Sequence, residues 1–386
     1  MTSAKAWLPL SRSASPIFRE NSRMSEDFPR DIGANDTVLM GVDGALGRIH
    51  LNRPEALNSL NLDMVRKIAW EIEALESNPA VRAIALTGEG RALCAGGDIK
   101  MIWQTGRTTP EAALAFWAEE YRLNARISHM RKPWLAVMDG ICMGGGVGLS
   151  VHGSHRVVTE RTRFAMPETG IGYFPDVGST WTLARAPEHL GFWIGLTGAS
   201  IGAADTIAAS LADVMIPSEA VPGLLSDIAS GRTVDAALDS YSVDPGASAL
   251  KDNAALIDRI FRIENIAGIF AALRADGSDF AMATLAHLAG KSPTSLVLTL
   301  HLLREANGST SLEDCLDREY AADATILAGH DFYEGVRAAV IDKDRAPVWS
   351  PARLEDVNQA ALLAAIKPRP SLFPRLPSDS LQWKEN

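Results

Sequence analysis

The chain has 386 residues, of which 47% are hydrophobic, and its formal net charge is −10. This length suits one large domain with a smaller one, or two domains, with a sizeable core. The negative net charge argues against nucleic acid or an anionic membrane surface as the main partner. Three cysteines and eight scattered histidines without metal-ligand spacing indicate metal-free chemistry in a reducing compartment. The longest apolar runs fall well short of the ~20 residues that a transmembrane helix needs.

Residues 1–36 differ in composition from the rest, since Ser, Pro and Arg dominate and no apolar period is present. Basic residues outnumber acidic ones before Met24, which fits a targeting peptide and equally fits a disordered tail. The sequence does not choose between the two. We therefore set residues 1–36 apart from the fold, and predict a cytoplasmic protein, with the mitochondrial matrix as the alternative.

From residue 37 onward, strand-like and helix-like segments alternate. Two apolar segments at 38–40 and 46–51 flank Asp43-Gly44, a hairpin signature, so two antiparallel strands should open the domain. Apolar residues at helical spacing from 62 to 75 predict a helix that ends at Asn78-Pro79. A strand at 81–87 and a helix at 110–129 precede the apolar run that begins at residue 134. This alternation predicts an α/β fold with its site at the strand ends.

Two glycine-rich segments each follow an apolar, strand-like run and each precede the start of a helix. They are residues 94–98 (Cys-Ala-Gly-Gly-Asp) and 144–146 (Gly-Gly-Gly). Two backbone N–H groups from such turns can converge on one oxygen and form an oxyanion hole, which suits an enolate or a tetrahedral intermediate. No Gly-Lys-Ser/Thr and no Rossmann spacing follows, so a nucleotide loop is excluded. A tight turn without a ligand is the alternative that glycine alone leaves open.

Beyond residue 213 the segments become rich in alanine and helical in pattern. Leucines between 285 and 303 form two helical stretches that Ser292-Pro293 separates. We expect a helical C-terminal region at 226–386 that packs on the α/β core of residues 37–225 and covers its pocket.

Four segments, in order along the chain, resemble the enoyl-CoA hydratase/isomerase (crotonase) superfamily. They are residues 51–58, 92–100, 139–150 and 164–169. The resemblance implies a crotonase-like ββα superhelix core over 37–225 that binds an acyl-CoA substrate, with no cofactor, since CoA is part of the substrate. It places the thioester carbonyl between the backbone N–H groups of Gly97 and Gly145. It also implies substrate contacts at Ala56, Leu57, Ala95, Asp98 and Ile99, with the adenine end of CoA near Ala56, Leu57 and Ile99.

The catalytic carboxylates separate the branches of this superfamily. Its hydratases use two glutamates, one just after the glycine run and one in a Pro-Glu loop. This chain has Gly148 at the first position and Glu168 at the second, which disfavours simple hydration. Asp176 supplies a second carboxylate in the same stretch. Such a pair can divide its work, one group attacking or activating water and the other orienting the substrate or moving a proton.

Four further segments resemble the 3-hydroxyisobutyryl-CoA hydrolase branch, namely 143–153, 175–178, 291–296 and 329–337. This resemblance implies hydrolysis of a short β-hydroxyacyl-CoA, with 3-hydroxyisobutyryl-CoA of valine breakdown as the best candidate, and it adds Glu120 to the substrate pocket. Two alternatives stay open, namely hydration or isomerisation of an enoyl-CoA by Glu168 alone, and a catalytically silent acyl-CoA-binding protein. A homo-oligomer is also an open alternative, because assembly varies among hydrolase relatives.

Each carboxylate has a purely structural alternative as well. Glu168 can be a surface loop residue, Asp176 can cap the helix expected just downstream, and Glu120 can lie on a solvated helix face. We expect Cys94 and Cys142, beside the glycine segments, to be small buried residues instead of nucleophiles.

Overall fold

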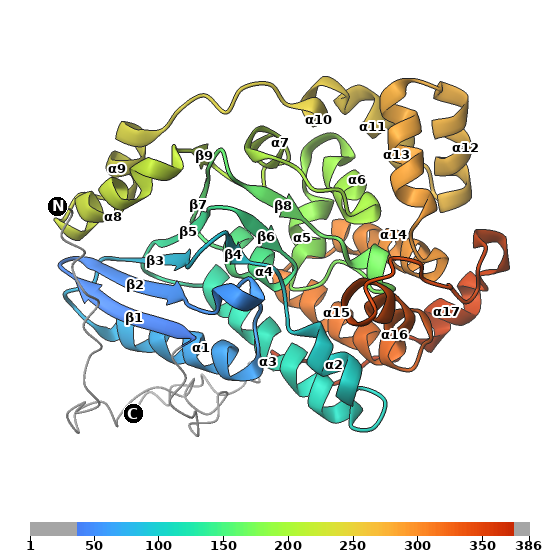
Figure 1. The fold of residues 1–386 in the computed structure, drawn as a ribbon, viewed down its shortest axis with the longest axis horizontal. Helices are drawn as coiled ribbons and strands as arrows, with labels where there is room; N and C mark the ends of the chain where they lie inside the picture. Colours follow the sequence, from blue (N-terminus) through green and yellow to red (C-terminus); the bar gives the residue numbers. More distant parts are fainter. Residues whose placement is uncertain (1–36, 374–386) are drawn as a thin grey trace, which may run out of the picture.

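The computed structural model describes residues 37–373, and the tail at 1–36 lies outside this range. A β-sheet region that carries the first half of the chain adjoins a cluster of helices from the second half (Figure 1). The alternation of strands and helices confirms the predicted α/β class.

The larger sheet has six strands in the order β1-β2-β3-β5-β7-β9. Their bounds are β1 (Val38–Asp43), β2 (Leu46–Leu51), β3 (Ala83–Gly88), β5 (Trp134–Met138), β7 (His155–Val158) and β9 (Val214–Met215). Strands β1 and β2 pair antiparallel through a turn in which Gly44 has a φ of 56°, as the hairpin signature predicts. The remaining neighbours are parallel.

The smaller sheet positions the two glycine segments side by side. It consists of β4 (Ala92–Cys94), β6 (Ile141–Met143) and β8 (Arg163–Ala165), all parallel. The first glycine segment joins β4 to α2 (Ile99–Thr105), and the second joins β6 to α4 (Gly145–Val151). Since parallel neighbours end at the same edge of a sheet, the two segments meet there, as predicted.

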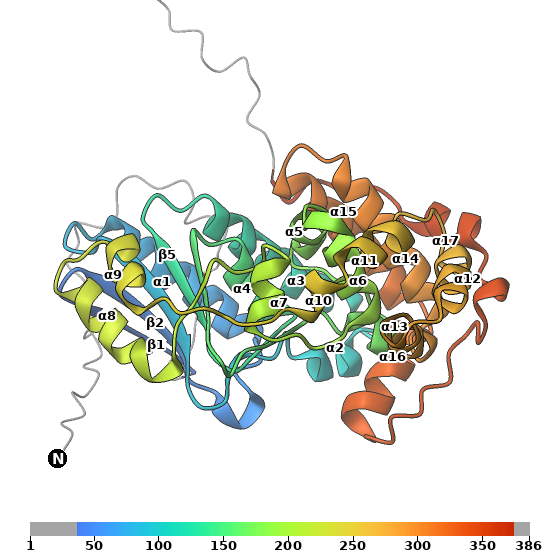
Figure 2. The ribbon, with the colours of Figure 1, turned by 90° about the horizontal axis from the view of Figure 1, so that it is seen from above.

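Side chains of the larger sheet alternate between two buried faces. Ile84 and Leu86 of β3 point into the main core, which includes α1 (Leu62–Ser77), whereas Ala83 and Ala85 face α8 (Val221–Ala229) and α9 (Val234–Tyr241). Figure 2 shows α8 and α9 beside the sheet. The sheet is thus covered by helices on both faces, as parallel sheets are.

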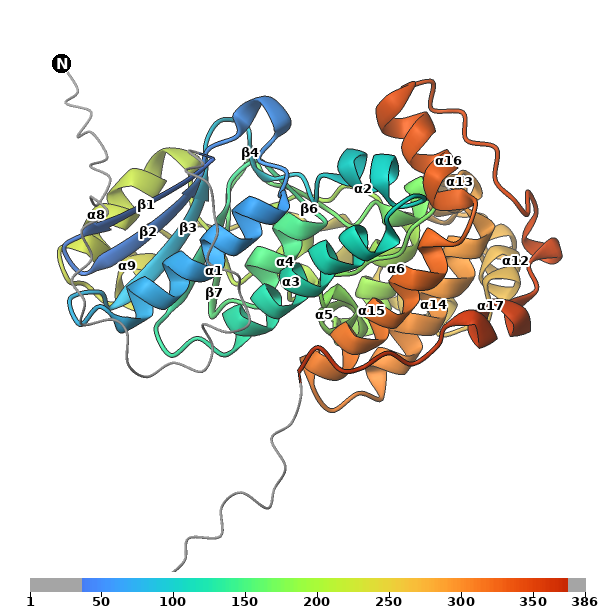
Figure 3. The same ribbon diagram turned by 90° about the horizontal axis from the view of Figure 1, so that it is seen from below.

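Helix α3 (Pro110–Ser128) links the sheet region to the helical region. It packs between α1 and α15 (Leu312–Leu327), and Figure 3 shows the three helices next to one another. The predicted helices at 62–77 and 110–129 are confirmed, and the Asn61 side chain caps α1 by accepting a hydrogen bond from Met64 N.

The second half of the chain is helical, as predicted. The remaining α-helices of the fold are α5 (Ser179–Ala184), α6 (Leu190–Thr197), α7 (Ala203–Ala208), α10 (Ala249–Asp252), α11 (Ala254–Phe261), α12 (Ile266–Asp276), α13 (Asp279–Ala289), α14 (Pro293–Asn307), α16 (Asp331–Val336) and α17 (Gln359–Ala365). The break between α13 and α14 coincides with Ser292-Pro293. The boundary expected at residue 226 falls inside α8, and the division into domains stays a prediction.

Candidate active site

A cavity of about 140 Å³ lies between α3, the two glycine segments, residues 167–176 and α16. Seven of the residues predicted from the sequence line it, namely Ala95, Gly97, Ile99, Glu120, Gly145, Glu168 and Asp176. They come from positions up to 81 residues apart in the sequence, and the fold brings them into one small space.

The two glycine segments present free backbone donors to this cavity. Neither the Gly97 N–H nor the Gly145 N–H donates to a backbone carbonyl within residues 37–373. Gly145 is the first residue of α4, where an N–H has no partner inside the helix. A Cβ atom added at Gly145 would collide with Glu120 Oε1 and would lie 3.4 Å from Gly97 N. A side chain at 145 would therefore displace Glu120, and both N–H groups border the same space, as an oxyanion hole requires.

Glu168 lies against the glycine segments. Only 6% of the residue is exposed, and its Oε1 would be 3.1 Å from a Cβ atom at Gly144. Its Oε2 is buried and has no hydrogen-bond partner within residues 37–373. Burial, and next the charge of Asp176, raise the pKa of Glu168 well above its ordinary value, while Lys291 acts in the opposite direction. The surface-loop alternative for Glu168 is wrong.

Asp176 is buried as well, with 5% of the residue exposed. Its Oδ2 accepts hydrogen bonds from the hydroxyls of Tyr121, at 3.0 Å, and Tyr173, at 3.3 Å. Burial raises the pKa of Asp176 to about 7, although these two hydroxyls favour its charged form. The N-cap of α5 is Gly178, and the donors to Asp176 Oδ2 are tyrosine hydroxyls instead of N–H groups of this helix, so the capping alternative for Asp176 is wrong.

Glu120 is the third carboxylate in the cavity. Only 2% of the residue is exposed, and its Oε1 has no hydrogen-bond partner within residues 37–373. Burial, followed by the charge of Asp176, raises the pKa of Glu120 well above its ordinary value. The solvated-face alternative is wrong, whereas its neighbour Glu119 forms an ion pair with Arg66 at 2.7 Å.

The backbone next to Asp176 is strained. Val177 has a φ of 55°, a conformation that is costly for a β-branched residue. Its carbonyl accepts a hydrogen bond from Nε2 of His152, at 2.8 Å. Burial lowers the pKa of His152 to about 4, so the ring is neutral at physiological pH. The surrounding structure thus fixes the loop in the conformation that directs Asp176 into the cavity.

Aromatic side chains form one wall of the cavity. Trp117 and Tyr173 stack with their ring centroids 5.5 Å apart, and Phe332 lies 5.8 Å from Tyr173. Phe332 belongs to α16, so the C-terminal region covers the cavity as expected. The sequence interpretation named none of these residues as site residues, although Tyr173 lies in the same glycine-rich loop as Asp176.

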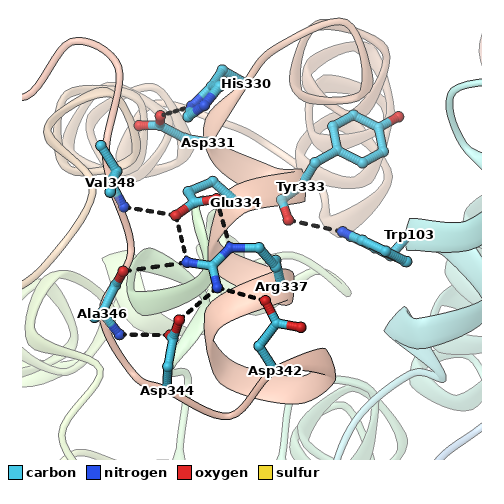
Figure 4. A network of polar contacts seen from close by, with 10 residues as sticks. All are labelled: Trp103, His330, Asp331, Tyr333, Glu334, Arg337, Asp342, Asp344, Ala346 and Val348. Carbon is cyan, nitrogen blue, oxygen red and sulfur yellow. Dashed lines mark hydrogen bonds and ion pairs between the residues drawn. The ribbon is translucent and has the colours of Figure 1, made fainter.

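Helix α16 is held in place by an ion-pair network around Arg337 (Figure 4). The guanidinium group binds Glu334 at 2.8 Å, Asp342 at 2.7 Å and Asp344 at 2.6 Å. On the other side, Trp103 Nε1 of α2 donates to the carbonyl of Tyr333, at 2.8 Å. These contacts fix the helix that carries Phe332.

Three predicted substrate-binding residues do not line the cavity. Leu57, whose carbonyl accepts a hydrogen bond from Ala95 N at 3.0 Å, and Ala56 lie behind the first glycine segment. Asp98 forms an ion pair with Arg53 at 3.0 Å. Contact of this region with the adenine end of CoA stays a prediction.

Gly148 has no space for a larger side chain. A Cβ atom there would lie 2.7 Å from Asn124 Nδ2 and 2.7 Å from Val177 Cβ. Contacts this close do not occur without a shift of the neighbours. The position that carries a glutamate in hydratases of the superfamily is thus closed to one in this packing.

The cysteines are unsuited to nucleophilic attack. Cys94 and Cys142 are fully buried, and burial raises the pKa of both thiols, that of Cys142 to about 12.

Among residues 37–373 no cluster of three or more His, Cys, Asp or Glu has the arrangement of a metal site. No helix in that range has the length and apolarity to span a bilayer.

Fold and site together define a class of protein. A family model described as enoyl-CoA hydratase/isomerase matches residues 46–366, so the chain belongs to that family. Among curated proteins it is similar to the mitochondrial 3-hydroxyisobutyryl-CoA hydrolase of Xenopus laevis, with 41% identity over 89% of this chain and 91% of that protein. The human enzyme of the same name is 39% identical over 85% of this chain and 88% of its own length.

Two solved structures share the fold over most of the chain. A carnitinyl-CoA dehydratase from Mycobacterium thermoresistibile has a TM-score of 0.84 and 42% identity, covering 88% of this chain and 99% of that one. An enoyl-CoA hydratase from Rhodobacter sphaeroides has a TM-score of 0.80 and 38% identity, covering 86% and 97%. These similarities confirm the predicted crotonase-like fold.

Proposed function

We propose that this protein hydrolyses the thioester of a short β-hydroxyacyl-CoA, namely 3-hydroxyisobutyryl-CoA, to 3-hydroxyisobutyrate and CoA, a step of valine breakdown. The observation that carries the proposal is the content of the cavity. Glu168 and Asp176 share it with two free N–H groups, while position 148 is closed to the glutamate of a hydratase. Relatives about 40% identical over most of the chain bear the name of this hydrolase, which supports the choice of substrate.

The reaction begins at the thioester carbonyl, whose oxygen accepts hydrogen bonds from Gly97 N and Gly145 N. These donors stabilise the negative charge that develops on the oxygen as the carbonyl becomes tetrahedral. Glu168, in its ionised form, either attacks the carbonyl carbon, giving an acyl-enzyme anhydride, or removes a proton from an attacking water. In both routes the C–S bond breaks, CoA leaves as a thiol after taking up a proton, and one water is consumed.

Asp176 acts on the part of the substrate that distinguishes a β-hydroxyacyl group. In its ionised form it accepts a hydrogen bond from the 3-hydroxyl, or it guides the hydrolytic water in the second step. Glu120 and the aromatic wall of Trp117 and Phe332 bound the space left for the acyl group. A cavity of about 140 Å³ suits a short acyl chain.

Hydration or dehydration at the α,β-bond is the second candidate function. It is favoured by the names of the two solved structures that share the fold, a carnitinyl-CoA dehydratase and an enoyl-CoA hydratase. Against it stands the absence of a side chain at Gly148, which leaves Glu168 to carry both the acid and the base role.

A thiol-release assay over a panel of acyl-CoAs separates these functions. We expect the purified protein to release CoA thiol from 3-hydroxyisobutyryl-CoA faster than from 3-hydroxypropionyl-CoA, and to leave the enoyl absorbance of crotonyl-CoA unchanged. Loss of that absorbance without thiol release would support hydration instead. Binding of CoA esters with neither signal would indicate an acyl-CoA-binding protein.

Three associated properties are part of the proposal. The site needs no cofactor, because two carboxylates and two backbone donors suffice for hydrolysis. Assembly as a homo-oligomer is open, and light scattering of the purified protein decides it. For the compartment we keep the cytoplasm as the prediction, while the word mitochondrial in the names of the vertebrate relatives supports the matrix alternative.

A further inference from the structure

A second group of polar side chains lies directly against Asp176, and of its members Tyr173 also lines the cavity. It consists of Tyr121 of α3, Tyr173 and Asp323 of α15. Asp323 is 0% exposed and does not line the cavity. Its Oδ1 lies 2.5 Å from the hydroxyl of Tyr173 and 3.4 Å from that of Tyr121. The same two hydroxyls contact Asp176, so they bridge two carboxyl groups.

The number of protons in this group is limited. Two phenol hydroxyls supply two protons, yet each oxygen approaches both Asp176 and Asp323. If both carboxyl groups were ionised, each carboxylate would receive a hydrogen bond from only one hydroxyl. The two negative charges would then face each other in a buried space. The other oxygen of Asp323, Oδ2, has no hydrogen-bond partner within residues 37–373, so nothing there stabilises a charge on Asp323.

The charges that surround the group are mostly negative. Glu319 of α15 acts on Asp323 directly, while Glu120 of α3 and Glu168 across the cavity act on its neighbour Asp176. A cation near this region is Lys291, two residues before α14, and its effect falls on Glu168. A further ionised carboxylate at Asp323 would add repulsion without a compensating cation.

Glu319, one turn earlier on α15, has donors that favour its charged form, and burial still raises its pKa to about 8. Its carboxylate accepts hydrogen bonds from Gly178 N, at 2.7 Å, from Thr180 N, at 3.3 Å, and from the Thr180 hydroxyl. Asp323 has no comparable set of donors. Burial, and next the charge of Asp176, raise the pKa of Asp323 well above its ordinary value, in agreement with this contrast.

We propose that Asp323 is a positioning residue that stays protonated during the reaction and directs the hydroxyls of Tyr121 and Tyr173 toward Asp176. Its proton then donates across the 2.5 Å contact to the Tyr173 oxygen. Both tyrosine hydroxyls are left to donate to Asp176 Oδ2, which favours the ionised form of Asp176 and fixes its orientation. All four side chains then have hydrogen-bond partners, and the one negative charge among them is on Asp176. The inference rests on the proposed function only in that Asp176 acts on the substrate.

The first test is the pH dependence of kcat/KM. In Tyr121→Phe, Asp176 loses a donor to its charged form, so the acidic limb of the profile moves to higher pH and kcat/KM near pH 6 falls roughly tenfold. Asp323→Leu removes the proton that orients Tyr173 and shifts the limb in the same direction. Asp323→Asn keeps a neutral donor at the same place, so it restores the position of the limb. Tyr320→Phe, on the same helix, is the matched control and leaves the profile unchanged.

A shift of the acidic limb to lower pH in Asp323→Asn would overturn the proposal. If Asp323 is ionised in the wild type, Asp323→Asn removes a negative neighbour and moves the acidic limb to lower pH. An unchanged profile in Asp323→Leu would equally contradict a positioning role.

The second test does not depend on activity. In protein labelled with ¹³C at its aspartate carboxyls, we expect one signal with the chemical shift of a protonated acid at pH 7 that persists in Asp176→Asn and is absent from Asp323→Asn. Absence of this signal from the wild type and from Asp176→Asn overturns the proposal even if Asp323→Asn does not fold. A wild type that releases no thiol from any acyl-CoA would refute the proposed function, and the carboxyl signal would still decide the state of Asp323.

Discussion

At the scale of single residues, Gly148 separates this chain from hydratases of its family by packing as well as by chemistry. Gly148→Ala should lower the free energy of unfolding by about 1–3 kcal/mol, because the added methyl group meets Asn124 and Val177 at 2.7 Å. Denaturant unfolding measures the change. Gly290→Ala is the control, since nothing lies within 4 Å of a Cβ atom there.

Restoring a glutamate at this position should not restore hydration. We expect Gly148→Glu to lose stability and to leave the absorbance of crotonyl-CoA unchanged, because its side chain cannot enter the cavity without moving α3 or the Asp176 loop. A stable Gly148→Glu variant that hydrates crotonyl-CoA would show that position 148 is open after all.

The residues that sequence reasoning found are those with a local pattern. Gly97, Gly145 and Glu168 lie in short segments whose order alone indicates the site, and all three line the cavity. No such local pattern distinguishes Asp323. It belongs to α15, more than a hundred residues from Asp176, and only the packing of α15 against α3 brings them together.

At the scale of elements, α16 determines how closed the cavity is. Arg337→Met should loosen α16, because Glu334, Asp342 and Asp344 would lose their shared cation. We expect faster hydrogen exchange over residues 331–348 and a several-fold lower kcat/KM, since Phe332 forms part of the cavity wall.

Arg353→Met is the matched control for this change. Arg353 pairs with Glu355 and Asp356 on the surface, and its side chain is 70% exposed, so its removal should leave exchange in α16 and activity as they are. Equal effects of the two variants would contradict a specific role of the Arg337 network.

Helices and strands with regular apolar spacing could be predicted from the sequence, and the way they pack could not. The helices at 62–77 and 110–128, and the break before α14, follow from spacing and from proline. The sequence also carries an unused signal in α15, where Glu319 and Asp323 occupy buried positions of an otherwise apolar face. A charged residue on such a face indicates a polar network, but its partners are set by the tertiary fold.

At the scale of the whole molecule, the buried carboxylates should make stability depend on pH in an unusual direction. Burial raises the pKa of Asp176 to about 7 and that of Glu319 to about 8, and it also raises those of Glu120, Glu168 and Asp323. The folded state therefore binds more protons than the unfolded state between about pH 4.5 and 8. The free energy of unfolding should fall as pH rises through this window, and Tm should be several degrees lower near pH 8.5 than near pH 5.5.

Other carboxylates act in the opposite sense and in another window. The Arg337 side chain lowers the pKa of Glu334 to about 2, so the stability that Glu334 contributes is present above pH 4.5 and is lost only in stronger acid.

A variant tests the contribution of the buried cluster. Asp176→Asn should flatten the loss of Tm above pH 5.5, whereas Glu219→Gln, at an exposed site, should not. A Tm that rises from pH 5.5 to 8.5 in the wild type would contradict this account of the buried cluster.

The most direct test of the central claim is thiol release from 3-hydroxyisobutyryl-CoA by the wild type and by Glu168→Gln. The amide keeps the shape of the side chain but can neither attack the carbonyl nor remove a proton from water. We predict rapid release by the wild type, a loss of kcat of roughly a hundredfold or more in Glu168→Gln, and binding of the acyl-CoA within a few fold of the wild type. Near-normal hydrolysis by Glu168→Gln would contradict the assignment of this cavity as the site of thioester hydrolysis.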